Sequence, residues 1–312
     1  MKTRLKENTW NNKKHIIRTK LLPYFGKLKL SSITPQQIIT WQNELMNCKD
    51  ENGKPYSPVY LRTIHTQLSA VFNHAVRYYN LKENPCQKAG AMGKKKAREM
   101  NFWTKDEYLQ FAEAIRDKPM AYHAFQMLYW CGIREGELLA LTPADFDFTR
   151  DTVTISKSYQ RIKGRDVITE PKTEKSNRTI TLPDFLAEEM RQYIDFLYGI
   201  QSDERLFPFT NSFLHHEMDR GCRISGVKRI RVHDLRHSAI SLLIDMGFSP
   251  LVIANRVGHE AIEITYNYAH LFHSRQQDMA KQLSQAMQEA PEPPDKPPHA
   301  PQLTLIKSDS AA

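Results

Sequence analysis

Residues 120–131 read MAYHAFQMLYWC, a run that would be apolar on nearly every side of a helix. Such a helix has no polar face to turn toward water, so it is stable only when other elements surround it. The run therefore predicts the central helix of a hydrophobic core. Shortly before it, residues 104–115 (TKDEYLQFAEAI) open with a Thr-x-x-Glu capping box, which predicts that a second helix begins there.

Three segments rich in β-branched residues follow the central helix: DTVTISKSYQ at 151–160, RDVITE at 165–170 and NRTITLP at 177–183. The polar stretches KGRD and KTEKSN separate them, which is typical of turns. Because β-branched residues favour strands, these segments predict a small antiparallel sheet. Helical patterns return over 184–199, 211–224, 233–246, 250–257 and 274–289. We expect a fold that is mostly α with a small antiparallel β-sheet.

The N-terminal part of the chain predicts a separate, all-helical domain. Apolar residues recur at helical spacing over 34–47 and 57–80. Residues 88–101 (KAGAMGKKKAREMN) combine two glycines and five basic residues with little apolar content, which favours an interdomain linker. The predicted organisation is a helical domain over 1–87, this linker, a second domain over 102–289 and a Pro-rich, disordered tail over 290–312.

Positive charge is concentrated at the start of the chain. Residues 1–101 hold 19 Lys and Arg against six Asp and Glu, a formal charge of +13, whereas the rest of the chain sums to −4. A domain with this much positive charge favours a polyanionic partner, and nucleic acid is the commonest polyanion in a cytoplasm. A solvated, lysine-rich surface is the alternative. Charge alone does not distinguish DNA from RNA or from an acidic membrane.

The composition is that of a soluble globular protein, because 40% of the 312 residues are hydrophobic and 25% are charged. No apolar run approaches the roughly 20 residues of a membrane span, and the basic start leads into no signal-peptide core. The four cysteines form no CxxC pair, so neither a disulfide framework nor a cysteine zinc site is indicated. We expect a cytoplasmic protein of two domains.

Four segments of the second domain carry a further pattern. They are CGIREGELLALTPADFD at 131–147, PKTEKSNRTITLP at 171–183, HDLRHSAISLL at 233–243 and VGHEAIEITYNYAHL at 257–271. Together they supply an Arg, a Lys on a hairpin, His-x-x-Arg, Gly-His and a Tyr nine residues after that His. The chain resembles the tyrosine recombinase (phage integrase) family. Its helical start, with ENGKPYS at 51–57, resembles the core-site-binding domain of integrases from conjugative transposons.

The resemblance implies an all-helical core-site-binding domain followed by an α+β tyrosine-recombinase catalytic domain. It implies a site-specific recombinase that integrates and excises a mobile element through a 3′-phosphotyrosyl intermediate, without ATP, cofactor or metal. The implied catalytic residues are Arg134, Lys172, His233, Arg236, His259 and Tyr268. The implied partners are double-stranded DNA with core-type attachment sites, further copies of the chain in a synaptic tetramer, and an excisionase. The implied location is the bacterial cytoplasm, at the nucleoid and not at a membrane.

These residue types suit the cleavage of a phosphodiester without a metal. Arg134 and Arg236 carry permanent charges on planar forks, which can bind the non-bridging oxygens of the transition state. Tyrosine is a poor nucleophile until its proton is taken, and His233 is the candidate acceptor. His259 is the candidate hydrogen-bond donor to the phosphate, and Lys172 is the candidate general acid for the departing 5′-oxygen.

Two residues compete for these roles. Tyr266 lies two residues before Tyr268, and on a helix the two side chains would point about 200° apart, so only one can face the site. The family spacing favours Tyr268. Lys175 competes with Lys172 on the same turn, where the match to the family's Lys-Thr favours Lys172.

Two neighbouring residues have other expected roles. Glu137 lies about one helical turn beyond Arg134, so we expect it to orient the guanidinium. His237 and His233 have the i,i+4 spacing of metal ligands, but the sequence shows no third ligand at a matching spacing. We therefore expect His237 to pack or to support its neighbours.

Other function classes fit parts of the sequence. A type IB topoisomerase would use a similar residue set to relax one duplex, and a catalytically silent DNA-binding regulator would keep the basic domain and lose the site. Integrases of this type commonly carry a further small N-terminal domain that reads arm-type sites. The sequence begins inside the core-binding domain, which leaves arm-site binding open.

Overall fold

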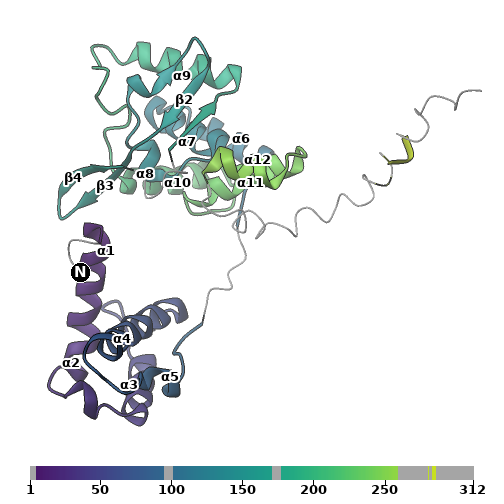
Figure 1. The fold of residues 1–312 in the computed structure, drawn as a ribbon. Coiled ribbons are helices and arrows are strands. Elements are labelled where there is room, and N and C mark those ends of the chain that lie inside the picture. The colour runs from purple at the N-terminus through teal and green to yellow at the C-terminus, as the bar shows by residue number, and fades with distance from the viewer. Residues whose placement is uncertain (1–4, 95–100, 171–176, 259–279, 281–282, 286–312) are drawn as a thin grey trace, which may run out of the picture. The chain divides into compact units, whose positions relative to one another are not determined.

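The computed structural model describes residues 5–94, 101–170, 177–258, 280 and 283–285. The described residues form two compact units, those within 1–101 and 160–167 and those within 102–159 and 168–312. Figure 1 shows the helices and strands of each unit. Among the helices described, none is both long enough and apolar enough to cross a membrane.

Helices build the first unit. They are α1 (Glu7–Ile16), a π-helical turn (Ile17–Leu21), α2 (Leu22–Phe25), a 3₁₀ turn (Leu30–Ser32), α3 (Pro35–Asn47), α4 (Pro58–Tyr78) and α5 (Pro85–Ala89). The helices expected over 34–47 and 57–80 are thus confirmed as α3 and α4. Each begins with Pro at its first position and a capping side chain before it, Thr34 for α3 and Ser57 for α4. Their apolar faces form one core around Ile38, Ile64 and Phe72.

Part of the segment expected to be a linker packs on this unit. Lys88 lies in α5, and Met92 is buried in the core of the first unit. Gly93 adopts a positive φ of 76°, and a Cβ there would lie 2.1 Å from the carbonyl oxygen of Pro58. Only glycine permits this approach, which lets the amide of Lys94 donate to the same carbonyl at 3.2 Å. The remainder, residues 95–100, is outside the part described.

The second unit is built around α7. Its helices are α6 (Lys105–Ala114), α7 (Pro119–Cys131), α8 (Glu135–Leu138), a 3₁₀ turn (Pro143–Asp145), α9 (Asp184–Phe196), α10 (Asn211–Ser225), α11 (Asp234–Asp245) and α12 (Pro250–Val257). Eight of the thirteen residues of α7 are buried, and α7 packs against α6, α9 and α11. The central helix expected from 120–131 is confirmed. The capping box predicted at Thr104 is also present, with Glu107 as its partner.

The described strands form two small sheets. The strands are β1 (Phe146–Asp147), β2 (Thr152–Ile155), β3 (Ser158–Ile162), β4 (Arg165–Thr169) and β5 (Arg178–Thr181). The first sheet has the antiparallel order β1-β2-β5, in which Val153 faces Ile180 and Ile155 faces Arg178. The second sheet is the hairpin of β3 and β4. The expected fold class, mostly helical with a small antiparallel sheet, is confirmed.

The segment 151–160 forms two strands, not the single strand that its composition suggests. It is divided at Ser156 and Lys157, which belong to neither β2 nor β3. There the ammonium of Lys157 lies 2.8 Å from the Asp145 carboxylate and donates to the Thr142 hydroxyl at 3.0 Å. This polar anchoring turns the chain from the first sheet into the hairpin.

Most of the helix expected over 274–289, and the tail over 290–312, lie beyond the described residues.

Candidate active site

Arg134 is held at the junction of α7 and α8. Helix α7 ends at Cys131, its cap Gly132 takes the left-handed conformation with φ 61°, and Arg134 is the N-cap of α8. The amide of Arg134 donates to Glu137 Oε2 at 3.0 Å, and its Nη1 donates to Glu137 Oε1 at 2.6 Å. Glu137 therefore orients the guanidinium, as the sequence predicts. The Arg134 side chain remains 38% exposed, so its guanidinium is accessible to a bound anion.

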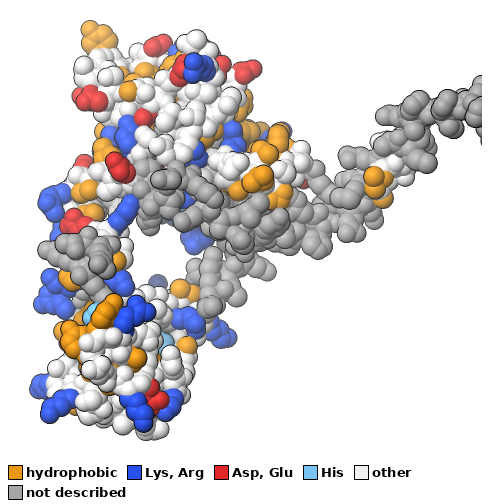
Figure 2. Space-filling model, in the orientation of Figure 1, with side chains coloured by type: hydrophobic (Ala, Val, Ile, Leu, Met, Phe, Trp, Pro, Cys, Tyr) orange, Lys and Arg blue, Asp and Glu red, His pale blue; other side chains and the backbone are white. Residues whose placement is uncertain are grey.

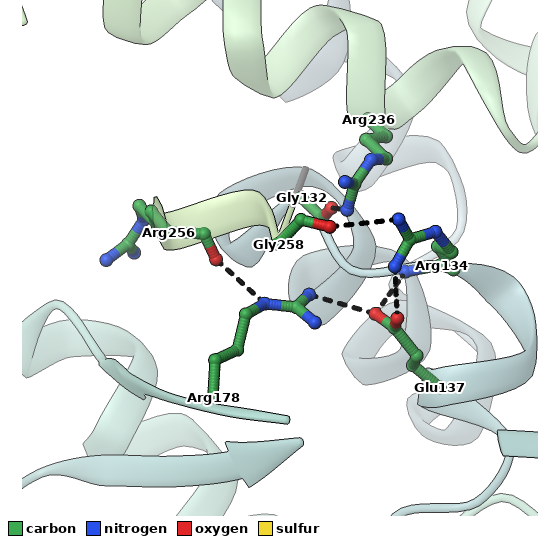
Figure 3. Close-up of polar contacts among 7 residues, drawn as sticks. All are labelled: Gly132, Arg134, Glu137, Arg178, Arg236, Arg256 and Gly258. Atoms are coloured by element: carbon green, nitrogen blue, oxygen red, sulfur yellow. Dashed lines mark hydrogen bonds and ion pairs between the residues drawn. The ribbon is translucent and has the colours of Figure 1, made fainter. Parts of the chain in front are cut away.

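Arg236 reaches the same junction from α11. The residue is buried, and its Nη1 donates to the carbonyl oxygen of Gly132 at 2.6 Å. Figure 3 shows the guanidinium groups of Arg236 and Arg134 converging from different elements on the Gly132 and Gly258 carbonyls. Two arginines that are distant in the sequence thus form one cationic site.

The start of α11 positions His233. This residue is the N-cap of α11, directly before Asp234, which is buried at the first helical position. Burial alone would raise the pKa of Asp234, but hydrogen bonds from Arg231 lower it below its usual value. The shortest of these runs from Arg231 Nη2 to Asp234 Oδ1, at 2.6 Å. The ionised Asp234 also suits the positive end of the helix dipole.

The surroundings of His233 keep its imidazole neutral. Desolvation, followed by the positive charge of Arg236, lowers the pKa of its imidazole below 6.5, and Arg231 and Arg134 act in the same direction. The carboxylate of Asp234 opposes this shift without cancelling it. The imidazole is therefore neutral at pH 7, which is the form that a general base needs.

His237 packs against His233, since the two ring centroids lie 5.5 Å apart in an edge-to-face arrangement. Nε2 of His237 lies 3.8 Å from the Asp234 carboxylate. Across the described part of the chain, no three His, Cys, Asp or Glu side chains are grouped so that they could hold a metal ion. The packing role expected for His237 agrees with these contacts.

Gly258 closes the site at the end of α12. It caps this helix in the left-handed conformation with φ 70°, and its carbonyl oxygen accepts a hydrogen bond from Arg134 Nη2 at 3.1 Å. A Cβ at this position would lie 2.9 Å from Arg178 Nη1.

Three of the six expected catalytic residues, Lys172, His259 and Tyr268, lie outside the residues that the structure describes.

Arg178 belongs to the same cluster, although no sequence motif singled it out. Its side chain is 6% exposed, and its Nη2 donates to Glu137 Oε2 at 2.9 Å. Burial of Glu137 would raise the pKa of its carboxyl, but the charges of Arg178 and Arg134 outweigh burial and lower this pKa. The sequence could have indicated the burial of Arg178, because side chains along a strand alternate between its two faces. Arg178 shares the inward face of β5 with Ile180, two residues further on.

Comparisons with known proteins agree with this architecture. Residues 101–275 match the phage integrase family, and residues 1–46 match the N-terminal SAM-like domain of phage integrases. The chain belongs to the phage integrase family. The ICEBs1 integrase of Bacillus subtilis is 30% identical over 293 residues, which cover 89% of this chain and 78% of that protein. The integrase of Mycobacterium phage D29 is 25% identical, covering 86% of this chain and 71% of that protein.

Solved structures of integrases share the fold. The Tn1549 transposon integrase, in complex with transposon right end DNA, matches with a TM-score of 0.72 and 20% identity over 85% of this chain and 89% of that one. A lambda integrase dimer bound to a COC′ core site matches with a TM-score of 0.61 and 19% identity over 85% of this chain and 72% of that one. As a member of its family, the protein is a tyrosine recombinase, an integrase of a mobile element that performs site-specific recombination.

Proposed function

We propose that this recombinase cuts and rejoins double-stranded DNA at core-type attachment sites through a 3′-phosphotyrosyl intermediate. Arg134 and Arg236 bind the scissile phosphate, and Tyr268 attacks it. His233 accepts the tyrosine proton, His259 donates a hydrogen bond to the phosphate, and Lys172 protonates the departing 5′-oxygen. The observation that carries the proposal is the convergence of Arg134 and Arg236 on one junction.

The chemistry follows from this geometry. A phosphodiester repels nucleophiles because it is negatively charged, and two fixed guanidinium groups stabilise the further charge of the transition state. They need no reorganisation, since Glu137 and the Gly132 carbonyl already hold them in place. The covalent bond to tyrosine conserves the energy of the broken diester, so a 5′-hydroxyl can reverse the step without ATP.

The first unit supplies the main contacts to the DNA backbone. Residues 1–101 of this unit carry a charge of +13, which matches a polyanion, and Figure 2 shows Lys and Arg side chains spread over the visible surface of the unit that contains α1 to α5. The choice of DNA rests on relatives, because the Tn1549 integrase was solved with transposon DNA and lambda integrase with a core site. From its five basic residues, we expect the segment 88–101 to contact the DNA backbone as well.

Recombination requires more than one copy of the chain. A lambda integrase tetramer was solved on a Holliday junction. We place this protein in the same kind of synaptic tetramer, in the cytoplasm of a bacterium and at the nucleoid, with an excisionase as a partner that sets direction. In this organisation residues 1–87 bind core DNA and residues 102–289 carry the chemistry.

A nicked suicide duplex tests the proposal. The full chain is incubated, with EDTA present, with a nicked duplex that bears the end of the mobile element encoding it. Denaturing electrophoresis should show a covalent adduct, which mass spectrometry should locate on Tyr268. Tyr268→Phe should bind the duplex and form no adduct, whereas Tyr266→Phe should still form it. An adduct on Tyr266, or loss of the adduct with EDTA, would contradict the proposal.

A further inference from the structure

The end of α12 is joined to β5 by two hydrogen bonds that run in opposite directions. Arg178 Nε, on β5, donates to the carbonyl oxygen of Arg256 at 2.9 Å. Arg256 Nη1, on α12, donates to the carbonyl oxygen of Thr181 at 3.0 Å. Arg256 also reaches the carbonyl oxygen of Trp130, near the end of α7, at 3.4 Å. These bonds fix the last turn of α12 against the sheet.

The same arginine of β5 also reaches the cationic site. Arg178 Nη2 donates to one oxygen of Glu137 at 2.9 Å, while the other oxygen accepts from Arg134 Nη1 at 2.6 Å. Arg134 in turn donates to the Gly258 carbonyl. The two arginines therefore share one carboxylate and each hold one carbonyl at the end of α12, which closes a ring of contacts (Figure 3).

We propose that Arg178 is a positioning residue for recombination, because it keeps Glu137 as a charged anchor for Arg134 and fixes the end of α12 to β5. The inference rests on the proposed function, in which Arg134 binds the phosphate. Arg178 also joins two elements that are close in sequence to expected catalytic residues. Strand β5 begins shortly after Lys172, and α12 ends shortly before His259.

The charge of Glu137 depends on its surroundings. The charged groups that contact it are Arg134 from the start of α8 and Arg178 from β5, with Arg256 of α12 one contact further away. Loss of Arg178 removes a positive charge and a hydrogen bond that both lower the pKa of this buried carboxyl, so the pKa rises from its wild-type value. As pH falls through that raised value the carboxyl takes up a proton, and a neutral carboxyl holds Arg134 less firmly. Loss of Arg178 should therefore cost more activity at low pH than at high pH.

Variants of the full chain test this with the same nicked duplex. R178Q should bind the duplex with unchanged affinity but form the adduct about 100-fold more slowly, because small displacements of a catalytic group have effects of this size. Its deficit relative to the wild type should widen as the pH is lowered, because the Glu137 carboxyl takes up a proton more readily once Arg178 is lost. R178K should show no widening, since it keeps the charge. It should still be slow, because an ammonium does not reproduce the two-sided contact of a guanidinium.

Two controls separate positioning from folding. R191Q removes an arginine of α9 that pairs with Glu188 and Asp151, and it should match the wild type at every pH. The double variant R178Q/E137Q removes the buried carboxylate that R178Q leaves without one partner. It should melt near the wild-type temperature and react slowly, with no widening of the deficit at low pH.

The outcomes are distinct. If the wild type forms no adduct, the proposed function fails and the inference falls with it. If the wild type reacts and R178Q equals it from pH 6 to about pH 8.5, only the positioning role is wrong. A deficit in R178Q that is the same at every pH would overturn the anchoring of Arg134 through Glu137.

Discussion

The guanidinium of Arg134 and the carbonyl oxygen of Gly258 are joined by a hydrogen bond of 3.1 Å. This bond connects the first arginine of the site to the turn that leads into His259. It requires the positive φ of Gly258 and the absence of a side chain there, because Arg178 occupies the space that a Cβ would fill. The glycine of the Gly-His pair is thus a structural requirement of the cationic site.

Gly258→Ala should therefore damage the site more than the fold. The substitution adds backbone strain of roughly 1–3 kcal/mol and a contact of 2.9 Å with Arg178. We expect normal binding of the duplex and loss of the covalent adduct. Gly226→Ala is the matched control, since Gly226 also caps a helix at φ 76°, but a Cβ there would have no neighbour within 4 Å among the described residues. It should lower thermal stability and leave adduct formation unchanged. Equal activity of both variants would contradict the argument.

The lowered pKa of His233 predicts the pH profile of cleavage. A base works in its neutral form, so adduct formation should be constant near pH 7 and 8 and decline only below 6.5, the ordinary value. His233→Gln should slow the reaction about 100-fold and remove this decline. His237→Gln, on the same helix, should keep both the rate and the decline. A wild-type profile that already falls between pH 8 and pH 7 would show that another group is the base.

The same lowered pKa has a consequence for stability. Because the folded state binds the His233 proton less tightly than the unfolded state does, this residue destabilises the fold as pH drops below 6.5. His233→Gln should reduce the loss of melting temperature between about pH 7 and pH 5.5, when it is compared with the wild type. If the melting temperature of His233→Gln falls as much between these two pH values as that of the wild type, the imidazole is not desolvated.

Sequence patterns predicted some features of the site better than others. The apolar run at 120–131 and the motifs around Arg134 and His233 depend on local spacing, which a sequence displays directly. Arg178 was missed because its role depends on pairing between β5 and β2 and on the distant end of α12. The division of 151–160 was missed because it depends on Lys157 reaching back to Asp145, a contact between elements.

The charge of the first unit predicts the salt dependence of DNA binding. Each phosphate neutralised by Lys or Arg releases counterions, so the slope of log affinity against log salt reports the number of such contacts. Deleting residues 1–101, which carry +13, should flatten this slope. Circular dichroism should show that the remaining chain, with its own core around α7, still melts cooperatively. A slope equal to that of the full chain would place the phosphate contacts in the second unit.

The last prediction concerns assembly. The segment 274–289 (SRQQDMAKQLSQAMQE) places Met279, Leu283 and Met287 at i, i+4 and i+8, which is one face of a helix. Of these, Leu283 lies in the described part and is 66% exposed. An apolar stripe predicted on an amphipathic helix favours burial against another surface, and the resemblance to integrases implies that this surface belongs to a neighbouring protomer. We expect docking in trans, with folding back on the same chain as the alternative.

Leu283→Asp with Met287→Asp should leave DNA binding and single cleavage nearly intact, while strand exchange and the multi-subunit complex on native gels are lost. Gln285→Asp with Gln288→Asp is the matched control. It adds the same charge to the opposite face of the helix and should recombine normally. If the Leu283 and Met287 variant recombines as the wild type does, the stripe has no role in assembly. If it unfolds the monomer instead, the segment packs on its own chain.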